Sequence, residues 1–378
     1  MLTIIVKGTD SCNLNCNYCS LGKKENRKMV SKEKLIEILD YSCRVAKFRN
    51  IFKVLFILHG GEPTIVDLEI YEEAIEIIEE RYPDIEKEYS IQTNAFNISE
   101  DYIRFFEKYN ITVGVSIDGS KEIHDLERTN INGEPTYEIV CKNIDRILER
   151  GIPVSCLMVL TSNALKEDFE YLNFFAERNL HLKINPLLNY GEVYEHPELS
   201  LKREEYARYI INMYEYILKN RISIGVSPID KLLSAFINRT NIGECTFNPR
   251  CNKNFICIDH KGEIYPCGKY SDLKEYRIGN IEDNKLDIFE SEIIKKLVAR
   301  RTDNKPSNCL NCKYVRYCNA SCNAEASIDG LINSAPLLCD DYKLLFDYFS
   351  GKGLELYKDY LLKYKEELIN YELRTSND

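Results

Sequence analysis

The most constraining feature of this sequence is its cysteine content. Its 378 residues hold 15 cysteines, twelve of which form an early triplet at Cys12, Cys16 and Cys19 and a larger set that begins at Cys245. The chain is far longer than a disulfide-stapled secreted scaffold, and a cytosolic protein keeps its thiols reduced. Clustered reduced thiols are typical ligands of soft metals, so we expect bound metal to organise part of this fold.

Charge and hydropathy narrow the class of protein. Lys and Arg number 50 against 60 Asp and Glu, a formal charge of −10, whereas a nucleic-acid or anionic-membrane binder presents a basic face. The longest aliphatic or aromatic run, Val54–Leu58, is too short to span a bilayer. Only Leu2–Val6 precedes Lys7, which is too little for a secretory segment. We therefore expect a cytoplasmic protein that binds neither nucleic acid nor membranes.

The first 220 residues alternate strand-like apolar runs with amphipathic helical stretches. Six such β–α units predict a parallel sheet with right-handed crossovers, and six are fewer than the eight of a closed barrel. We therefore expect an α/β fold with a partial (β/α)6 TIM-like barrel, open on one side for a large substrate. The predicted strands are 2–6, 52–58, 89–93, 112–117, 154–160 and 182–185, and the predicted helices are 31–46 and one from Ser99, both capped by serine, with 71–81, 136–150, 167–177 and 202–219.

The sequence changes character near Cys245, where strands shorten, helical periodicity fades and cysteines crowd in. We expect the following segments: the barrel at 1–220, a bridging segment at 221–244, a metal-held domain at 245–345 and a C-terminal helix within 346–378, over roughly Leu354–Leu373. Three cysteines fall on helix or strand faces of the barrel, where we expect core residues. They are Cys43, Cys141 and Cys156.

The first cysteine group, CNLNCNYC from Cys12 to Cys19, lies on the loop after the first predicted strand. In a β/α barrel, reactive groups belong on the loops that follow the strands. Three thiolates on one short loop can bind three irons of a cubane iron–sulfur cluster, which leaves the fourth iron open to a ligand that is not protein. A zinc site completed by a distant residue is the alternative.

With this motif the chain resembles the radical S-adenosylmethionine (radical SAM) enzymes. In that family SAM chelates the open iron, and reduction of the cluster cleaves SAM to a 5′-deoxyadenosyl radical that abstracts a hydrogen atom. Further matches follow the next three strands. HGGEP at 59–63 resembles the family's GGEP motif, QTNA lies at 92–95, and SIDG lies at 116–119, with His124 and Arg128 shortly after.

The resemblance implies which residues bind SAM. The bare glycines would let backbone carbonyls approach its amino group, and Arg128 would bind its carboxylate through charge-assisted hydrogen bonds. Tyr18 and the backbone at Leu187 would line the adenine. The full set of implied contacts is Tyr18, Gly60, Gly61, Glu62, Gln92, Asn94, Ser116, Arg128 and Leu187.

The later cysteines are spaced as in a second known domain. Cys251 is followed after ten residues by Gly262 and after four more by Cys267, and the run C-x2-C-x5-C-x3-C over 309–322 precedes Cys339 by sixteen residues. This resembles the SPASM domain of a radical SAM subgroup, which holds two auxiliary [4Fe–4S] clusters. Taken alone, the run over 309–322 also fits a zinc tetrathiolate.

The resemblance implies interleaved ligand sets, and with the first cluster it implies three [4Fe–4S] clusters. Auxiliary cluster I would take Cys251, Cys267, Cys322 and one further cysteine, for which Cys245 is preferred. The rival, Cys257, lies in a short apolar strand where a buried unligated thiol is expected. If Cys245 is not a ligand, this cluster has an open iron for a substrate thiolate. Auxiliary cluster II would be bound by Cys309, Cys312, Cys318 and Cys339.

Within the family, residues 4–345 most closely resemble anaerobic sulfatase-maturating enzymes, which oxidise a Ser or Cys of a sulfatase to formylglycine. Those enzymes carry an Asp base directly after the third cysteine of auxiliary cluster I, where this chain has Gly268. Other SPASM enzymes install thioether or carbon–carbon cross-links in ribosomally made peptides. Because Gly268 removes the base, we expect a peptide maturase that cross-links a small precursor peptide, with formylglycine formation as the alternative.

This chemistry sets expectations for partners and bases. The substrate would be a precursor peptide, and flavodoxin or ferredoxin would donate electrons. Cys12 comes too early for an N-terminal leader-recognition domain, so a separate protein or the enzyme's own surface would recognise the leader. Asp118, His59, Asp259 and Tyr265 are unranked candidates for the base. A non-catalytic electron-transfer or zinc-binding protein is the alternative of another class.

Overall fold

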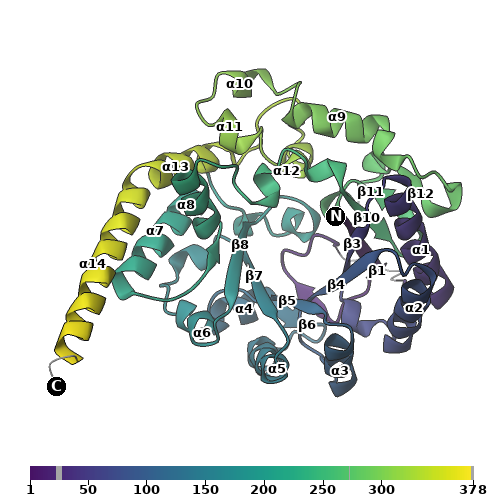
Figure 1. Cartoon of the computed structure of the whole chain (residues 1–378), viewed down its shortest axis with the longest axis horizontal. Helices are drawn as coiled ribbons and strands as arrows, with labels where there is room; N and C mark the ends of the chain where they lie inside the picture. The colour runs from purple at the N-terminus through teal and green to yellow at the C-terminus, as the bar shows by residue number, and fades with distance from the viewer. Residues whose placement is uncertain (23–27, 272, 376–378) are drawn as a thin grey trace.

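The computed structural model describes residues 1–22, 28–271 and 273–375, and only the backbone of residues 364–375. Its core is a ten-stranded sheet, which forms an arc of strands ringed by helices (Figure 1). Six strands are parallel neighbours in chain order, which confirms the predicted partial barrel. They are β1 (Leu2–Thr9), β3 (Lys53–Gly60), β4 (Glu86–Thr93), β5 (Thr112–Ser116), β7 (Val154–Leu160) and β8 (His181–Pro186).

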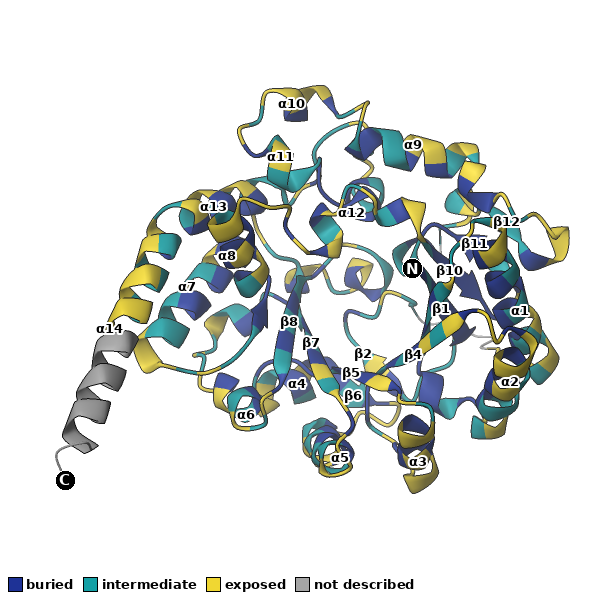
Figure 2. Cartoon of the chain, in the orientation of Figure 1, coloured by how far each residue is buried: buried dark blue, intermediate teal, exposed yellow. Residues whose placement is uncertain are grey.

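Amphipathic helices follow the strands and turn their apolar sides to the sheet, so that buried residues face inward (Figure 2). The side chains of Ser31 and Ser99 accept hydrogen bonds from the first helical turns, as predicted for N-caps. Cys43 and Cys156 are buried in this core, and Cys141 packs half-buried against it. The helices of this part are α1 (Lys32–Phe48), α2 (Leu68–Arg81), α3 (Glu100–Lys108), α4 (Lys121–Glu127), α5 (Tyr137–Glu149), α6 (Leu172–Glu177), α7 (Glu205–Asn220) and α8 (Ile229–Asn238).

One expectation about helices is wrong. The helix predicted over 167–177 begins only at Leu172, because Glu167 turns its carboxylate to the backbone N–H of Ser120 at 3.3 Å instead of entering a helical turn. Helices also form beyond residue 245, where several are too short for a clear helical periodicity in the sequence. They are α9 (Glu292–Arg301), α10 (Ser307–Leu310), α11 (Val315–Cys318), α12 (Asn323–Ile328), α13 (Cys339–Ser350) and α14 (Lys352–Thr375), the last being the predicted C-terminal helix.

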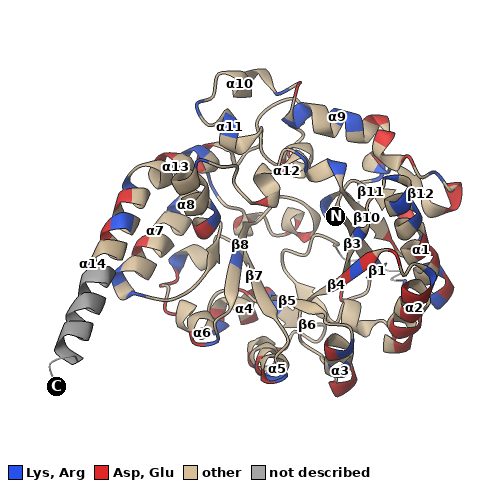
Figure 3. Ribbon diagram, in the orientation of Figure 1, with Lys and Arg blue, Asp and Glu red and all other residues tan. Residues whose placement is uncertain are grey.

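None of the helices in the described part of the chain is long and apolar enough to cross a membrane. Charged residues of both signs lie along the helices, with acidic residues frequent on α2 and basic ones on α9 (Figure 3).

The cysteine-rich segment joins the barrel through the sheet itself. Strand β10 (Phe255–Asp259) pairs in parallel with β1, and Cys257 lies opposite Ile5. The apolar run of β1 buries Leu2, Ile4 and Val6 in the core, whereas Thr3 and Ile5 on the opposite face are half-buried. The barrel sheet thus includes strands from beyond residue 245. The segment limits proposed from the sequence remain predictions. The other strands are β9 (Val226–Ser227), β11 (Glu263–Tyr265) and β12 (Gly279–Asn280) in this sheet, and the separate pair β2 (Leu14–Cys16) and β6 (Arg128–Asn130).

Backbone contacts hold together the carboxyl ends of β1 and β3. The N–H groups of Gly61 and Glu62 donate to the carbonyls of Thr9 (2.7 Å) and Ser11 (2.8 Å). A Cβ atom on Gly61 would lie 2.1 Å from the Ser11 carbonyl oxygen, and one on Gly60, whose φ is +141°, would lie 2.3 Å from that of Thr9. Only glycine fits at either position, so these two residues fix where the loop after β1 begins.

A buried histidine fixes the loop after β5. His124 Nδ1 accepts a hydrogen bond from the backbone N–H of Asp118 (3.2 Å), and its Nε2–H donates to the hydroxyl of Thr136 (3.0 Å). That hydroxyl donates in turn to the carbonyl of Arg128 (2.6 Å). This arrangement selects the neutral tautomer, and burial together with the Arg128 charge lowers the pKa of His124 to about 2.

Replacement of Gly61 by alanine should displace the loop after β1, because the atoms that its Cβ would meet are backbone. We expect Gly61→Ala to keep its secondary structure by circular dichroism but to bind about four fewer irons per chain, one cubane, after anaerobic reconstitution. The matched control is Gly243→Ala, whose Cβ would approach only Lys231 Cδ at 3.7 Å. Equal iron contents in the two variants would contradict the assignment.

Acidification should destabilise the protein partly through His124. The unfolded side chain binds a proton below about pH 6.5, whereas the folded one stays neutral down to about pH 2. Stability present above pH 6.5 is therefore lost as the pH falls, by about 1.4 kcal/mol between pH 7.5 and 5.5. We expect His124→Asn to lose less unfolding free energy than wild type over this range in urea titrations. Identical losses would disprove the linkage.

Candidate functional site

The loop between β1 and α1 carries the first three cysteines at the carboxyl end of the barrel strands, as predicted. Strand β2 within this loop pairs antiparallel with β6, which places Cys16 directly opposite Arg128. The backbone N–H of Cys19 donates to the Cys16 carbonyl at 3.2 Å and closes a tight turn between the last two cysteines. All three thiols of this triplet loop are half-buried.

Burial raises the pKa values of the first two of these thiols. The pKa of Cys12 rises to about 11 and that of Cys16 to about 12, and the neighbouring thiol of Cys19 raises both further while Arg128 lowers both. Metal coordination deprotonates such thiols and releases their protons. The three thiols stand on one short loop, and the Arg128 guanidinium beside them would offset the negative charge of a bound cluster.

Arg128 is the centre of a buried polar group. Its Nη1 donates to the Tyr18 hydroxyl at 2.7 Å and lies 3.7 Å from the carboxylate of Asp118, to which the Tyr18 hydroxyl donates. Burial raises the pKa of Asp118, and the charge of Arg128 opposes that effect. Among the described residues nothing accepts from the buried Nε of Arg128. A buried donor without a protein partner is suited to an anionic ligand beside the triplet loop.

The predicted adenine contacts lie together. The ring of Tyr18 packs with Leu187 and Val193 in a small apolar cluster after β8. The backbone N–H of Glu192 donates to the carbonyl of Cys19 at 2.9 Å, which ties this segment to the triplet loop.

Side chains at the ends of β4 and β5 complete the predicted set. Gln92 donates to the Ser116 hydroxyl at 3.0 Å. The amide of Asn94 donates to Asn13 Oδ1 at 2.8 Å and to Cys12 Sγ at 3.6 Å. Asn94 thus contacts the cysteine loop directly, while Gln92 and Ser116 bond to each other at the ends of β4 and β5.

Glu62 contributes to this site indirectly, through hydrogen bonds to other residues. Its buried carboxylate accepts hydrogen bonds from the backbone and hydroxyl of Thr64 (3.0 and 2.7 Å), the hydroxyl of Thr93 (2.6 Å) and the backbone of Asn94 (2.7 Å). Burial raises the pKa of Glu62, and these bonds lower it. Glu62 thus joins the loop after β3 to the loop after β4 and positions Asn94 against Cys12.

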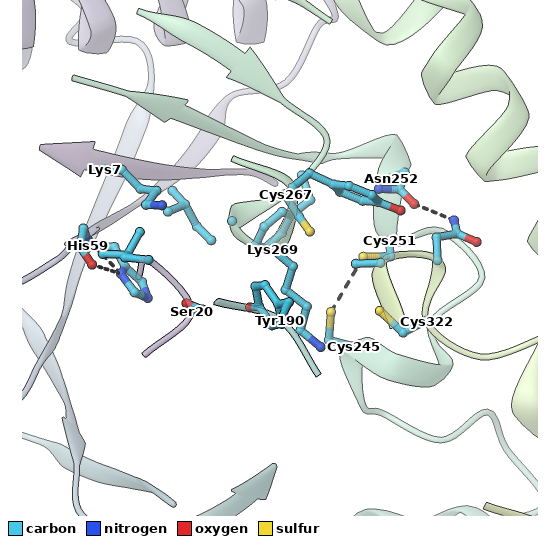
Figure 4. A pocket seen from close by; sticks show the side chains of 18 of the residues that line it. Lys7, Ser20, His59, Tyr190, Cys245, Cys251, Asn252, Cys267, Lys269 and Cys322 are labelled. Carbon is cyan, nitrogen blue, oxygen red and sulfur yellow. Dashed lines mark hydrogen bonds between the residues drawn. The ribbon is translucent and has the colours of Figure 1, made fainter. Parts of the chain in front are cut away.

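A cavity of about 270 Å³ lies between the triplet loop and four of the later cysteines (Figure 4). Ser20, His59 and Gly60 line it on the side of the triplet loop. We call the four cysteines on the other side auxiliary set I: Cys245, Cys251, Cys267 and Cys322.

Cys245, rather than Cys257, lies with the other three cysteines at the cavity. Its Sγ lies 3.7 Å from Cys251 Sγ. Cys257 is instead buried within β10 and is not among the described residues that line the cavity. Burial raises the pKa of Cys267, and Cys322 and Cys245 raise it further.

The remaining predicted ligands form a second group on α10, α11, α13 and the turn between them. Burial raises the pKa of Cys318 to about 12, and the other three thiols of the group raise it further. We call this group auxiliary set II: Cys309, Cys312, Cys318 and Cys339.

Of the four candidate bases, only His59 lines the cavity. Its Nδ1 accepts from the backbone N–H of Gly60 at 2.8 Å, so the ring proton lies on Nε2. Burial and the charge of Lys7 lower the pKa of His59 to about 4. His59 therefore presents a neutral N–H donor.

The other candidates are engaged elsewhere. Asp259 accepts from the backbone N–H groups of Lys261 and Glu263 in the turn between β10 and β11, both at 2.9 Å. Tyr265 donates to Glu263 at 3.0 Å. Asp118 belongs to the Arg128 group described above.

Two lysines of the cavity are missed by sequence reasoning. Lys7 lies 2.5 Å from the Ser271 hydroxyl, and Lys269 pairs with Glu325 at 3.3 Å. Both line the cavity, and no Asp or Glu is among its described lining residues. The available signals were the break that Lys7 makes in the apolar run of β1, and the position of Lys269 two residues after a predicted ligand.

Residues 6–176 match the sequence model of the radical SAM superfamily, and residues 245–313 match that of the SPASM iron–sulfur cluster-binding domain. A cysteine-type anaerobic sulfatase-maturating enzyme of Clostridium novyi is 28% identical over 358 residues, which cover 92% of this chain and 94% of that protein. A serine-type anaerobic sulfatase-maturating enzyme of Bacteroides thetaiotaomicron is 25% identical over 396 residues, with coverages of 98% and 92%.

Solved structures have the same fold. Native anSMEcpe with bound AdoMet superposes with a TM-score of 0.80 at 24% identity and covers 94% of this chain and 99% of that one. Streptococcus suis SuiB bound to precursor peptide SuiA gives a TM-score of 0.64 at 20% identity, with coverages of 88% and 74%. Together with the two family matches and the arrangement of the cysteines, these likenesses identify the chain as a radical SAM superfamily enzyme that carries a SPASM domain.

Proposed function

We propose that this radical SAM enzyme matures a peptide, in that it removes a hydrogen atom from a residue of a ribosomally made precursor and forms a thioether or carbon–carbon cross-link. The observation that carries the proposal is the lining of the central cavity, where Gly268 and Lys269 follow Cys267 and no described residue is acidic. The leader of the precursor would be recognised by a separate protein or by the enzyme's own surface.

The triplet loop would hold the first cluster, with SAM beside it. Arg128 would bind the SAM carboxylate through its unpartnered Nε, and Tyr18 and Leu187 would pack on the adenine. When bound, SAM supplies the radical that abstracts hydrogen. Glu62 would serve by positioning Asn94. The other proposed contacts at these strand ends are Gly60, Gly61, Gln92 and Ser116.

Auxiliary sets I and II would hold two further [4Fe–4S] clusters, which makes three. Full ligation by four thiols suits electron transfer, with flavodoxin or ferredoxin as the external partner.

The cavity suits a substrate thiol. A cross-link removes two hydrogens from the peptide. One leaves as an atom taken by the 5′-deoxyadenosyl radical, and the other would leave as a proton released to solvent while one electron would pass to an auxiliary cluster. His59 presents an N–H donor and Lys7 and Lys269 present cations, and these groups stabilise an anion. A Cys thiol, with an ordinary pKa of about 8.5, ionises readily in such surroundings, whereas a Ser hydroxyl does not. A thioether from a peptide Cys is therefore the favoured cross-link.

Formylglycine formation is the second candidate. The near full-length similarity to cysteine-type sulfatase-maturating enzymes favours it, and the cavity cations would also ionise a sulfatase Cys. The two candidates differ at Gly268, where the sulfatase-maturating enzymes resembled here carry their Asp base.

Substitution of the triplet cysteines should abolish SAM cleavage but leave the auxiliary clusters in place. We expect the combined variant Cys12→Ala, Cys16→Ala and Cys19→Ala to produce no 5′-deoxyadenosine under reducing conditions, because the open iron is lost. It should retain about eight of about twelve irons per chain, those of the auxiliary clusters. Iron analysis and chromatography of SAM products measure both. Continued SAM cleavage would reject the assignment of the triplet, and zinc in place of the remaining iron would reject the auxiliary clusters.

A peptide with the sulfatase Cys motif should distinguish the two candidate functions. We expect no aldehyde from the wild-type enzyme in a hydrazide-capture assay, because Gly268 provides no base. Gly268→Asp should produce aldehyde, since its Cβ would meet only flexible Ile5 side-chain atoms, the nearest at 3.1 Å. Gly268→Asn is the uncharged control and should produce none. Aldehyde formation by the wild type at the rate of Gly268→Asp would favour formylglycine formation instead.

A further inference from the structure

Two consecutive arginines at the end of α9 are buried. Arg300 is 5% exposed and Arg301 is 2% exposed. Buried charges in proteins are normally paired, yet the described residues provide neither guanidinium with a carboxylate partner. The end of their own helix contributes about half a negative elementary charge, which is less than the two full positive charges require. Another anionic group must therefore balance them.

Arg300 is held by uncharged acceptors. Its Nε and Nη2 donate to the carbonyls of Ile332 and Ser334, each at 2.7 Å. Its Nη1 donates to the carbonyl of Ala320 at 2.9 Å and to Asn323 Oδ1 at 3.1 Å. Ala320 and Asn323 flank Cys322 on a segment that begins at Cys318, so Arg300 is fixed against the stretch of chain that connects auxiliary set II to auxiliary set I.

Arg301 has fewer partners and lies closer to the cavity. Its Nη2 donates to the carbonyl of Thr246 at 2.7 Å, and its buried Nε has no partner among the described residues. Its side chain lines the cavity with auxiliary set I. The neighbouring Arg300 donates to the carbonyl of Ala320, which lies between Cys318 of auxiliary set II and Cys322 of auxiliary set I. The arginine pair is therefore placed beside both auxiliary sets.

We propose that Arg301, supported by Arg300, is the shared counter-charge of the two auxiliary iron–sulfur sites and raises the reduction potentials of both. The proposal rests on the ligand sets given under the proposed function. A cubane with four thiolate ligands is anionic, and one-electron reduction adds a further negative charge. A fixed buried cation stabilises the reduced form more than the oxidised form. The unpartnered Nε is also a donor for sulfur, and hydrogen bonds to sulfur tune such potentials.

The test is a potentiometric titration of the reconstituted full chain, monitored by EPR spectroscopy and without peptide. The triplet variant Cys12→Ala, Cys16→Ala and Cys19→Ala serves as background, so that only auxiliary clusters are observed, each taking one electron from dithionite. In this background we expect Arg301→Gln to weaken electron binding at both clusters by about tenfold, which is about 59 mV for a one-electron couple. Arg301→Lys keeps the positive charge and should change electron binding at both clusters less than threefold.

Arg49→Gln is the matched control, because Arg49 also has a buried Nη1 without a partner among the described residues but stacks on the Phe289 ring at 3.9 Å. It should shift neither potential. Unchanged potentials in Arg301→Gln, or equal shifts in the Gln and Lys variants, would overturn the proposal.

If Arg301→Gln binds little auxiliary iron, iron content becomes the readout. Full iron in Arg301→Lys then supports the counter-charge, and equal loss in both variants overturns it. Failure to cross-link a peptide would leave these results standing, whereas absence of auxiliary iron from the parent protein would overturn both the ligand sets and this proposal.

Discussion

The close approach of the glycine pair after β3 to the end of β1 determines the geometry of the whole site. Thr9 and Ser11 accept backbone hydrogen bonds from Gly61 and Glu62 at distances that leave no room for a Cβ atom. This junction sets the start of the triplet loop, and the Glu62 carboxylate then fixes the neighbouring strand end through Thr93 and Asn94. The side chain of Asn94 is thereby held against Cys12.

The parallel pairing of β10 with β1 has an equally direct consequence for the chemistry. Because the cysteine-rich segment adds its strand to the barrel sheet, auxiliary set I lies across one cavity from the triplet loop. A substrate side chain in that cavity would have the site of radical formation on one side and a route for an electron on the other. The lining combines cationic Lys7 and Lys269 with a neutral His59, which favours a substrate that reacts as an anion.

The local features of this arrangement could be predicted from the sequence. The spacing of the triplet cysteines and the apolar runs of β1 and β3 are properties of short segments, and the loops after strands carry the reactive groups in such folds. The role of Glu62 could not be predicted, because two of its partners, Thr93 and Asn94, lie at the end of another strand. Lys7 and Lys269 line the same cavity only because β1 pairs with β10, and this pairing joins segments far apart in the sequence. The sequence alone makes Arg301 look like an ordinary surface residue near a helix end, because nothing in it indicates that the side chain is buried.

The central claim is that the triplet loop holds a cluster with an open iron at which SAM binds. Electron–nuclear double resonance of the reduced protein, with SAM labelled by nitrogen-15 at its amino group and carbon-13 at its carboxylate, measures this directly. The account predicts hyperfine couplings from both labels to one of the clusters, and their loss in the triplet variant. A cluster spectrum that SAM leaves unchanged in the wild-type protein would contradict it.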